Sequence, residues 1–339
     1  MKRRTFLLGA SGAAACSRRP RLNVYNWSDY VAPDTISNFE NETGIEVRYG
    51  TFESIPEMLA KVMSGNSGWD VVFPSAEYIL PMREMGLLAP LRSEWLPNLG
   101  ALEASFRHPH WDPDMRWSVP YMWGVTGIVY RTSLSPAPES WRDLWSGRLA
   151  GKLTMLDDPP EVLGACLEML GYSLNSSRPE ELAKAQREAI AQKSLVRGYL
   201  NAEVRDQLVA GDVAAAQAWA VTAAQAIQAA PGKLAFAFPR EGFARFADTM
   251  AILRESRRQE NAHRFIDYLL RPDVSAKIVV AVQTATANGA AHALLPAELR
   301  DNPVLYPPPE TLARGEWFEA QSAASQRLRD RLWTEIKSA

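Results

Sequence analysis

A short stretch near the N-terminus gathers the residue types that hold small cations. Residues 25–30 read Tyr-Asn-Trp-Ser-Asp-Tyr, so Trp27, Ser28 and Asp29 bring an indole, a hydroxyl and a carboxylate together. Aromatic faces attract cations, and a carboxylate neutralises them. These residues favour a site for a small ligand that carries an ammonium group. The same spacing also fits a loop in which Trp27 packs in the core and Asp29 caps the next helix.

The segments on either side alternate between strand and helix patterns. Apolar residues predict a strand at 22–25, and helical spacing predicts a helix at 33–41. A second strand is expected at 45–49, a second helix from residue 54, and a short buried strand at 69–75. Strands that alternate with helices are typical of an α/β fold with mixed, mostly parallel sheets flanked by helices.

Two segments in the middle of the chain are expected to cross between lobes. Residues 119–130 are aromatic and dotted with glycine, and 249–253 form another apolar run. Two crossings between two α/β lobes leave a cleft between them, and loops at strand C-termini face it. Ligands bind at such positions in open α/β sheets. The sequence thus predicts a hinged clamp around a small ligand.

The N-terminus is predicted to be an export signal at 1–15. Basic residues at 2–4, apolar residues at 6–8 and small residues after them form this pattern, and the arginine pair resembles a twin-arginine signal. Cleavage is expected just before Cys16, which would then carry a lipid anchor. Ala13 departs from the usual leucine of a lipoprotein processing box, and ordinary cleavage a few residues away is the alternative.

Charge and cysteine content exclude several classes of protein. Without Lys2, Arg3 and Arg4, 34 basic residues face 39 acidic ones, a net charge of −5. A mildly acidic, exported chain without a basic cluster is no candidate for binding nucleic acid. Cys166 is the only cysteine besides Cys16, so no disulfide framework is expected, and the core must supply the stability.

Beyond these patterns, the chain resembles the periplasmic polyamine-binding proteins of bacterial ABC importers, most closely the putrescine-binding branch. The resemblance runs from about Leu22 to the C-terminus. Its fixed points are Tyr-Asn-Trp-Ser-Asp-Tyr (25–30), Glu-Thr-Gly-Ile (42–45), Trp-Asp-Val-Val-Phe-Pro-Ser (69–75), Pro-Tyr-Met-Trp-Gly-Val-Thr-Gly (120–127), Glu161-Val162, Gly211-Asp212, Pro-Arg-Glu-Gly (239–242), Leu-Arg-Pro-Asp-Val (270–274) and Tyr-Pro-Pro (306–308).

The resemblance implies a two-lobed periplasmic-binding-protein fold of type II with the ligand cleft between the lobes. Lobe 1 would comprise 21–127 and 248–300, and lobe 2 would comprise 128–247. The C-terminal segment 301–339 would pack across both lobes. Such a protein sits in the periplasm or on the outer face of the cell membrane and hands its ligand to a membrane permease and ATPase.

The family's ligand contacts carry over to particular residues of this chain. An extended polyamine would lay its methylenes against aromatic rings, at Trp27, Trp219 and Phe246. Its ammonium ends would meet oxygen atoms of Ser28, Asp29, Ser75, Asp158, Glu161 and Asp248. An ammonium taken out of water needs such pairing, because burying it unpaired costs several kcal/mol.

Two positions depart from the family pattern, and a third position adds an acid. Thr222 stands where relatives carry an aspartate or another polar group, and Thr284 stands where a tyrosine is expected. Glu77 is an additional acid close to Ser75, and it could restore the missing charge from the other lobe. Alternatively, the ligand is another cationic amine with only one strongly basic end.

Two rival classes of function stand beside transport. An enzyme acting on a small cationic or sugar substrate would need a catalytic motif, and none is recognisable, since the adjacent Asp157 and Asp158 diverge in a loop. His108-Pro109-His110 lacks a third ligand, so no metal and no cofactor are expected. A ligand-sensing protein would use the same fold and cleft as a transport protein, and the sequence does not separate the two.

Overall fold

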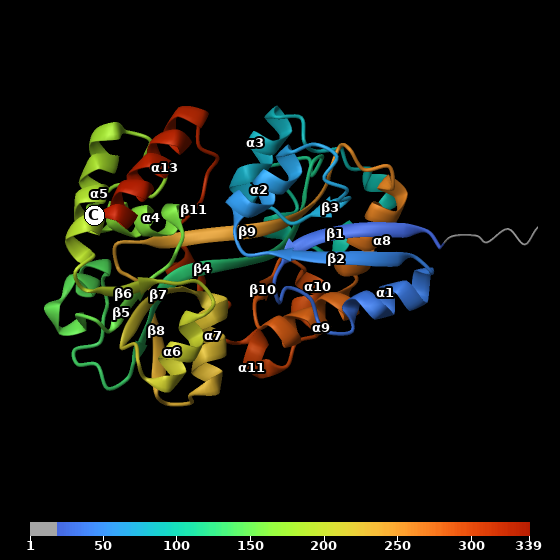
Figure 1. Cartoon of the computed structure of the whole chain (residues 1–339). Coiled ribbons are helices and arrows are strands. Elements are labelled where there is room, and N and C mark those ends of the chain that lie inside the picture. The colour runs from blue at the N-terminus through green and yellow to red at the C-terminus, as the bar shows by residue number, and fades with distance from the viewer. Residues whose placement is uncertain (1–18) are drawn as a thin grey trace, which may run out of the picture.

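Two lobes joined by long strands make up the computed structural model of this chain, which describes residues 19–339 (Figure 1). The strands β4 (Val119–Arg131) and β9 (Phe243–Ile252) extend from one lobe into the other. The predicted export signal at 1–15 and the predicted lipidation site Cys16 lie outside the described residues.

Strands and helices alternate along most of the chain. The other strands are β1 (Arg21–Trp27), β2 (Glu46–Phe52), β3 (Val71–Val72), β5 (Leu153–Met155), β6 (Val196–Tyr199), β7 (Ala215–Trp219), β8 (Leu234–Ala237), β10 (Ala285–Thr286) and β11 (Gly315–Trp317). The helices are α1 (Thr35–Thr43), α2 (Ile55–Met63), α3 (Ile79–Glu84), α4 (Pro159–Met169), α5 (Pro179–Gln192), α6 (Val204–Ala210), α7 (Ala220–Ala229), α8 (Gln259–Leu270), α9 (Pro272–Val282), α10 (Gly289–His292), α11 (Ala297–Arg300), α12 (Pro309–Leu312) and α13 (Ala323–Ser338).

Each lobe contains a mixed sheet, which confirms the predicted α/β class. The strand order is β2-β1-β3-β9-β4 in the first lobe and β4-β7-β5-β6 in the second, where β8 also pairs with β4. The strands β1, β2 and β3 run parallel, as do β5, β6 and β7. Every antiparallel pair in the described part of the chain involves β4 or β9. The strands β4 and β9 run antiparallel to each other, so at least one of them must run against the parallel strands of each sheet.

The predicted buried strand at 69–75 is shorter in the structure, where only Val71–Val72 pair regularly. Pro74 has no N–H to donate to a ladder, which ends the regular pairing there. Its carbonyl instead accepts hydrogen bonds from the amide and the hydroxyl of Thr249, each at 2.9 Å. A single bridge then joins Ser75 to Asp248 on β9. This irregular end brings two predicted site residues together.

The lobe boundaries predicted at 127/128 and 247/248 fall inside β4 and β9, at the crossing itself. The C-terminal segment also touches both sides. The hydroxyl of Tyr306 accepts a hydrogen bond from the backbone amide of Thr286, in the first lobe, at 3.2 Å. Further on, β11 pairs in parallel with β9, and α13 packs against α4 and α5 of the second lobe.

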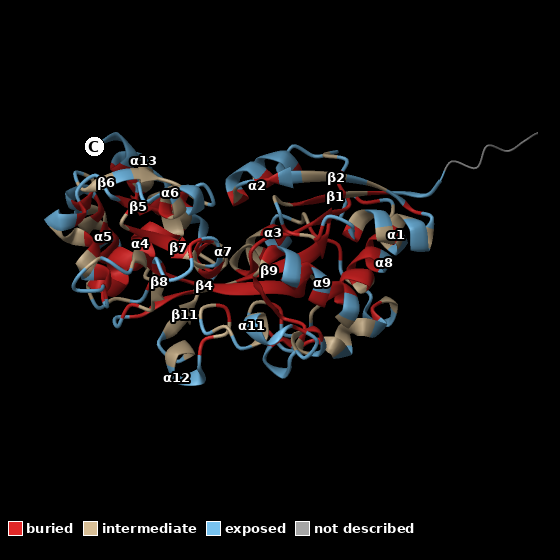
Figure 2. Ribbon diagram, turned by 90° about the horizontal axis from the view of Figure 1, so that it is seen from below, coloured by how far each residue is buried: buried red, intermediate tan, exposed pale blue. Residues whose placement is uncertain are grey.

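Buried residues follow the crossing strands and the helices that cover the sheets (Figure 2). All residues of β4 up to Val129 are buried. Cys166 is buried on α4 as a free thiol. No helix within residues 19–339 combines the length and the apolar character needed to cross a membrane.

Candidate functional site

Asp248 occupies the middle of β9 and is almost fully buried, with 5% of its surface exposed. The Tyr30 hydroxyl donates to Oδ2 at 2.6 Å, and the Ser75 hydroxyl donates to Oδ1 at 2.9 Å. Burial raises the pKa of Asp248 to about 6, while these two hydrogen bonds act in the opposite direction. Asp248 caps no helix, so the alternative structural role considered for such an acid does not apply to it.

Glu77 lies two residues beyond Ser75, in the short 3-10 turn Ala76–Tyr78. Its pKa is raised to about 8, mainly by burial and also by the charges of Asp248 and Asp158, while a backbone hydrogen bond acts in the opposite direction. Its Oε2 atom is buried and accepts no hydrogen bond from any described residue. Because Asp158 belongs to the second lobe and Asp248 lies on β9 in the first, the pKa of Glu77 is raised by carboxylates from both lobes.

Glu161 and Asp158 begin helix α4 in the second lobe. Asp158 is the N-cap residue, and its Oδ1 accepts from the Glu161 amide at 3.2 Å. The Glu161 side chain, 3% exposed, accepts from Thr126 Oγ1 and Trp219 Nε1 through Oε1, both at 2.8 Å. Its Oε2 is buried without a donor among the described residues. Burial, followed by the Asp158 charge, raises the pKa of Glu161 well above its usual range.

These four carboxyl groups have no basic partner in the part of the chain that the structure describes. None of the ion pairs found within residues 19–339 includes Glu77, Asp158, Glu161 or Asp248. Buried acids without a counter-charge are destabilised as anions. A cationic ligand with N–H donors would supply both the charge and the missing hydrogen bonds.

The predicted aromatic residues lie on three different elements. Trp27 ends β1 and packs on Phe52, with ring centroids 4.6 Å apart, and its indole nitrogen is buried without an acceptor in the described part of the protein. Trp219 ends β7 and donates to Glu161, as described above. Phe246 on β9 lies over Gly124 of β4, to which it is paired.

The two threonines that depart from the family pattern are both buried. Thr222, 4% exposed, lies in the first turn of α7, three residues after Trp219. Thr284, 2% exposed, lies next to the Tyr30 phenol. Burial, followed by the Asp248 charge, raises the pKa of Tyr30 well above its usual range.

The side chains of Ser28 and Asp29 make other contacts or face solvent. The Ser28 hydroxyl donates to Glu53, a neighbouring exposed acid. Asp29 is exposed, and its backbone adopts a left-handed conformation with a φ of 53°. The N-cap of helix α1 is Asp34, so Asp29 does not cap that helix either.

The sequence-based site omitted two residues that contact its carboxylates, Tyr30 and Thr126. Both lie within the quoted motifs, Tyr30 at the end of 25–30 and Thr126 within 120–127. Their presence in those motifs was the available signal. The sequence could not show that Tyr30 contacts Asp248, because the two residues are 218 positions apart along the chain.

Comparison with known proteins identifies the family of this chain. Residues 34–305 match the family model described as bacterial extracellular solute-binding protein. The chain is 33% identical to the putrescine-binding periplasmic protein PotF of Escherichia coli, covering 98% of this chain and 95% of PotF. The chain belongs to the bacterial extracellular solute-binding proteins.

Further relatives of this solute-binding protein support the same assignment. The spermidine/putrescine-binding periplasmic protein of Escherichia coli is 34% identical, covering 94% of this chain and 92% of the relative. A solved structure titled as a putative spermidine/putrescine ABC transporter from Listeria monocytogenes matches with a TM-score of 0.90 and 31% identity, covering 94% of this chain and 98% of that one. The fold is therefore that of a two-lobed solute-binding protein, and the protein is not an enzyme.

Proposed function

We propose that this protein captures a polyamine with two ammonium ends, such as putrescine or spermidine, between its lobes and delivers it to an ABC importer. The relatives named above are described as binding putrescine or spermidine, and two of them are periplasmic proteins. The protein would act outside the cytoplasm, with export through a twin-arginine signal and a lipid anchor at Cys16 as further parts of the proposal.

The unsatisfied oxygens of Glu77 and Glu161 carry this proposal. One comes from each lobe, both are buried, and neither finds a donor among the described residues. An ammonium group offers three N–H donors and a positive charge, so it meets both needs at once. Asp248 with Tyr30 and Ser75 would complete one end of the site, and Asp158 with Trp219 would complete the other.

Glu77 would supply the negative charge that Thr222 lacks. In this proposal the acids are shared between the lobes, with Glu77 and Asp248 on one side and Asp158 and Glu161 on the other. Trp27, Trp219 and Phe246 would contact the methylenes, and Ser28, Asp29, Thr222 and Thr284 would lie at the edges of the site. A sensing role without a transporter would use the same contacts.

A ligand screen tests the proposal directly. Purified protein is heated with putrescine, spermidine, cadaverine, agmatine, lysine and arginine, and with neutral and anionic compounds of similar size as controls. A ligand specific to the folded state raises stability, by about 2.7 kcal/mol at a hundredfold excess over its Kd. At least one diamine or triamine should raise the Tm strongly. Stabilisation only by neutral or anionic compounds would refute the proposal.

A further inference from the structure

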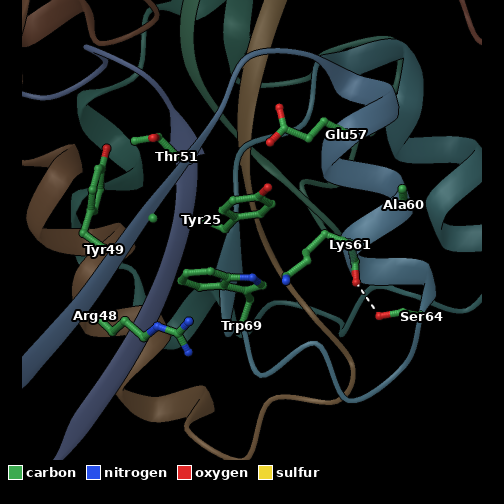
Figure 3. Close-up of a pocket in the computed structure, with 10 residues that line it drawn as sticks. Tyr25, Arg48, Tyr49, Thr51, Glu57, Ala60, Lys61, Ser64 and Trp69 are labelled. Atoms are coloured by element: carbon green, nitrogen blue, oxygen red, sulfur yellow. Dashed lines mark hydrogen bonds between the residues drawn. The ribbon is translucent and has the colours of Figure 1, made fainter.

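A second groove lies away from the carboxylate cluster, between strand β2 and helix α2 (Figure 3). Its volume is about 710 Å³, and none of its lining residues belongs to the proposed polyamine site. The strand β2 forms the edge of the sheet in the first lobe, which leaves this groove open to solvent. The function proposed above makes no use of it.

Trp69 forms the floor of the groove. Its ring stacks on Tyr25 with centroids 4.8 Å apart and planes 10° apart, and the Arg48 guanidinium lies 4.7 Å from the ring centroid. The ring fits here because Gly50 has no side chain, since a Cβ at that position would lie 2.4 Å from the indole. Trp69 is 5% exposed, and its Nε1 donor is buried without an acceptor among the described residues.

Two unpaired cations stand beside this indole. Arg48 and Lys61 both line the groove, and neither takes part in an ion pair with any residue of 19–339. Figure 3 shows the Lys61 side chain extending toward the indole nitrogen of Trp69. Glu57, one turn earlier on α2, accepts instead from the backbone amide of Glu53 at 2.9 Å.

From this arrangement we propose that the groove binds a small oxyanion, a carboxylate or phosphate group, between Arg48, Lys61 and the indole N–H of Trp69. A guanidinium matches such a group with two parallel hydrogen bonds, and an ammonium adds a point charge. The indole N–H gains the acceptor that it lacks. Glu57 faces the same groove and opposes anion binding, so its removal strengthens the interaction.

Phosphate titration with an NMR readout on Trp69 tests this site. The indole N–H signal of Trp69 is assigned by its loss in Trp69→Phe, and inorganic phosphate is added at constant ionic strength against chloride. The native protein should show a saturable shift of this signal. Arg48→Gln with Lys61→Gln should weaken phosphate binding at least tenfold, and Glu57→Gln should tighten it severalfold.

A matched control changes the same charges elsewhere. Arg327→Gln with Lys152→Gln removes an exposed arginine from helix α13 and an exposed lysine from the second lobe, and it should leave phosphate binding unchanged. Absence of a saturable shift at 50 mM phosphate (roughly fivefold above a 10 mM Kd), or equal binding by both double variants, would overturn the proposal. Weaker phosphate binding by Glu57→Gln would also overturn it, because removing a negative charge from the groove must strengthen the binding of an anion there.

The source of the oxyanion is separated by a second measurement. Acetate and phosphate probe soluble anions, and vesicles of phosphatidylglycerol with phosphatidylcholine probe a lipid headgroup. Vesicle binding that is lost in the Arg48/Lys61 double variant assigns the site to a headgroup, and phosphate binding alone assigns it to a soluble anion. Putrescine affinity of the double variant should equal that of the native protein, so this proposal and the polyamine proposal fail independently.

Discussion

Individual carboxyl groups in the proposed site differ in how completely they are satisfied. Both oxygens of Asp248 accept hydrogen bonds, from Tyr30 and Ser75, whereas Glu77 and Glu161 each keep one oxygen without a donor. Asp248 is thus held in place before any ligand arrives. The other two offer the free acceptors. Pre-positioning of this kind lowers the entropy that binding must overcome.

Removing the charge of Asp248 should reduce polyamine affinity far more than removing the Ser75 hydroxyl. Asp248→Asn keeps the size of the side chain but leaves an ammonium without its counter-charge, at a cost of about 2–5 kcal/mol. Ser75→Ala removes one neutral hydrogen bond, worth about 1 kcal/mol. Isothermal titration with putrescine measures both. Small effects of equal size would contradict the assigned role of Asp248.

Polyamine affinity should fall as the pH falls from 8 to 5. The pKa values of Glu77, raised to about 8, and of Asp248, raised to about 6, leave these acids partly protonated in that range without ligand. A cation favours the ionised form, so binding must release protons, and each released proton makes affinity change by up to about tenfold per pH unit. Titrations in buffers with different ionisation enthalpies count these protons. An affinity that is constant over this range would contradict the prediction.

At the scale of elements, the pairing of β4 with β9 sets the geometry of the crossing. Gly124 is paired with Phe246, and Met122 is paired with Asp248, with the pair Trp123–Ala247 between them. Residues two apart along a strand share a face of the sheet, so Phe246 and Asp248 bring an aromatic ring and a carboxylate to the same side. A Cβ at Gly124 would lie 2.6 Å from Cζ of Phe246. Only glycine leaves the ring in its present position.

Gly124→Ala should therefore lower both stability and polyamine affinity. The ring of Phe246 must move, and such overpacking costs about 1–3 kcal/mol. Without a clash, alanine would instead stabilise the fold through the unfolded state, by about 0.4–1 kcal/mol. Urea unfolding distinguishes the two signs. Gly100→Ala is the matched control, since a Cβ there meets nothing within 4 Å, and identical behaviour of the two variants would contradict the argument.

At the scale of the whole molecule, acids from the two lobes approach one another. The charge of Asp158 in the second lobe raises the pKa of Glu77 in the first. Like charges repel, and the repulsion is strong where water is excluded. A polycation between them changes this repulsion into attraction. Ligand binding and lobe closure are therefore expected to be coupled through the strands β4 and β9.

Putrescine should make the protein more compact in solution. Small-angle X-ray scattering is expected to give a smaller radius of gyration with saturating putrescine than without it. Glu161→Gln should show little change at the same putrescine concentration, because the second lobe then loses a counter-charge. Scattering curves that coincide with and without ligand, for native protein that binds putrescine, would rule out closure on binding.

Much of this architecture could be predicted because its signals are local. Apolar spacing located β1, α1 and β2, and ordered motifs identified the family. The strand predicted at 69–75 was too long, because Pro74 ends regular pairing and Thr249, distant in sequence, takes its carbonyl. The role of Asp29 stays a prediction, since its side chain is exposed.

The sequence by itself determined which residue types are available to a cation: Trp27, Asp158, Glu161, Trp219 and Asp248 were all named from the resemblance to the family. Only the tertiary structure decided which of them lack partners. Tyr30 and Ser75 reach Asp248 across 218 and 173 positions, and one buried oxygen each of Glu77 and Glu161 has no donor among the described residues. Desolvation and hydrogen bonding depend on neighbours in space, and distant neighbours leave no local pattern in a single sequence.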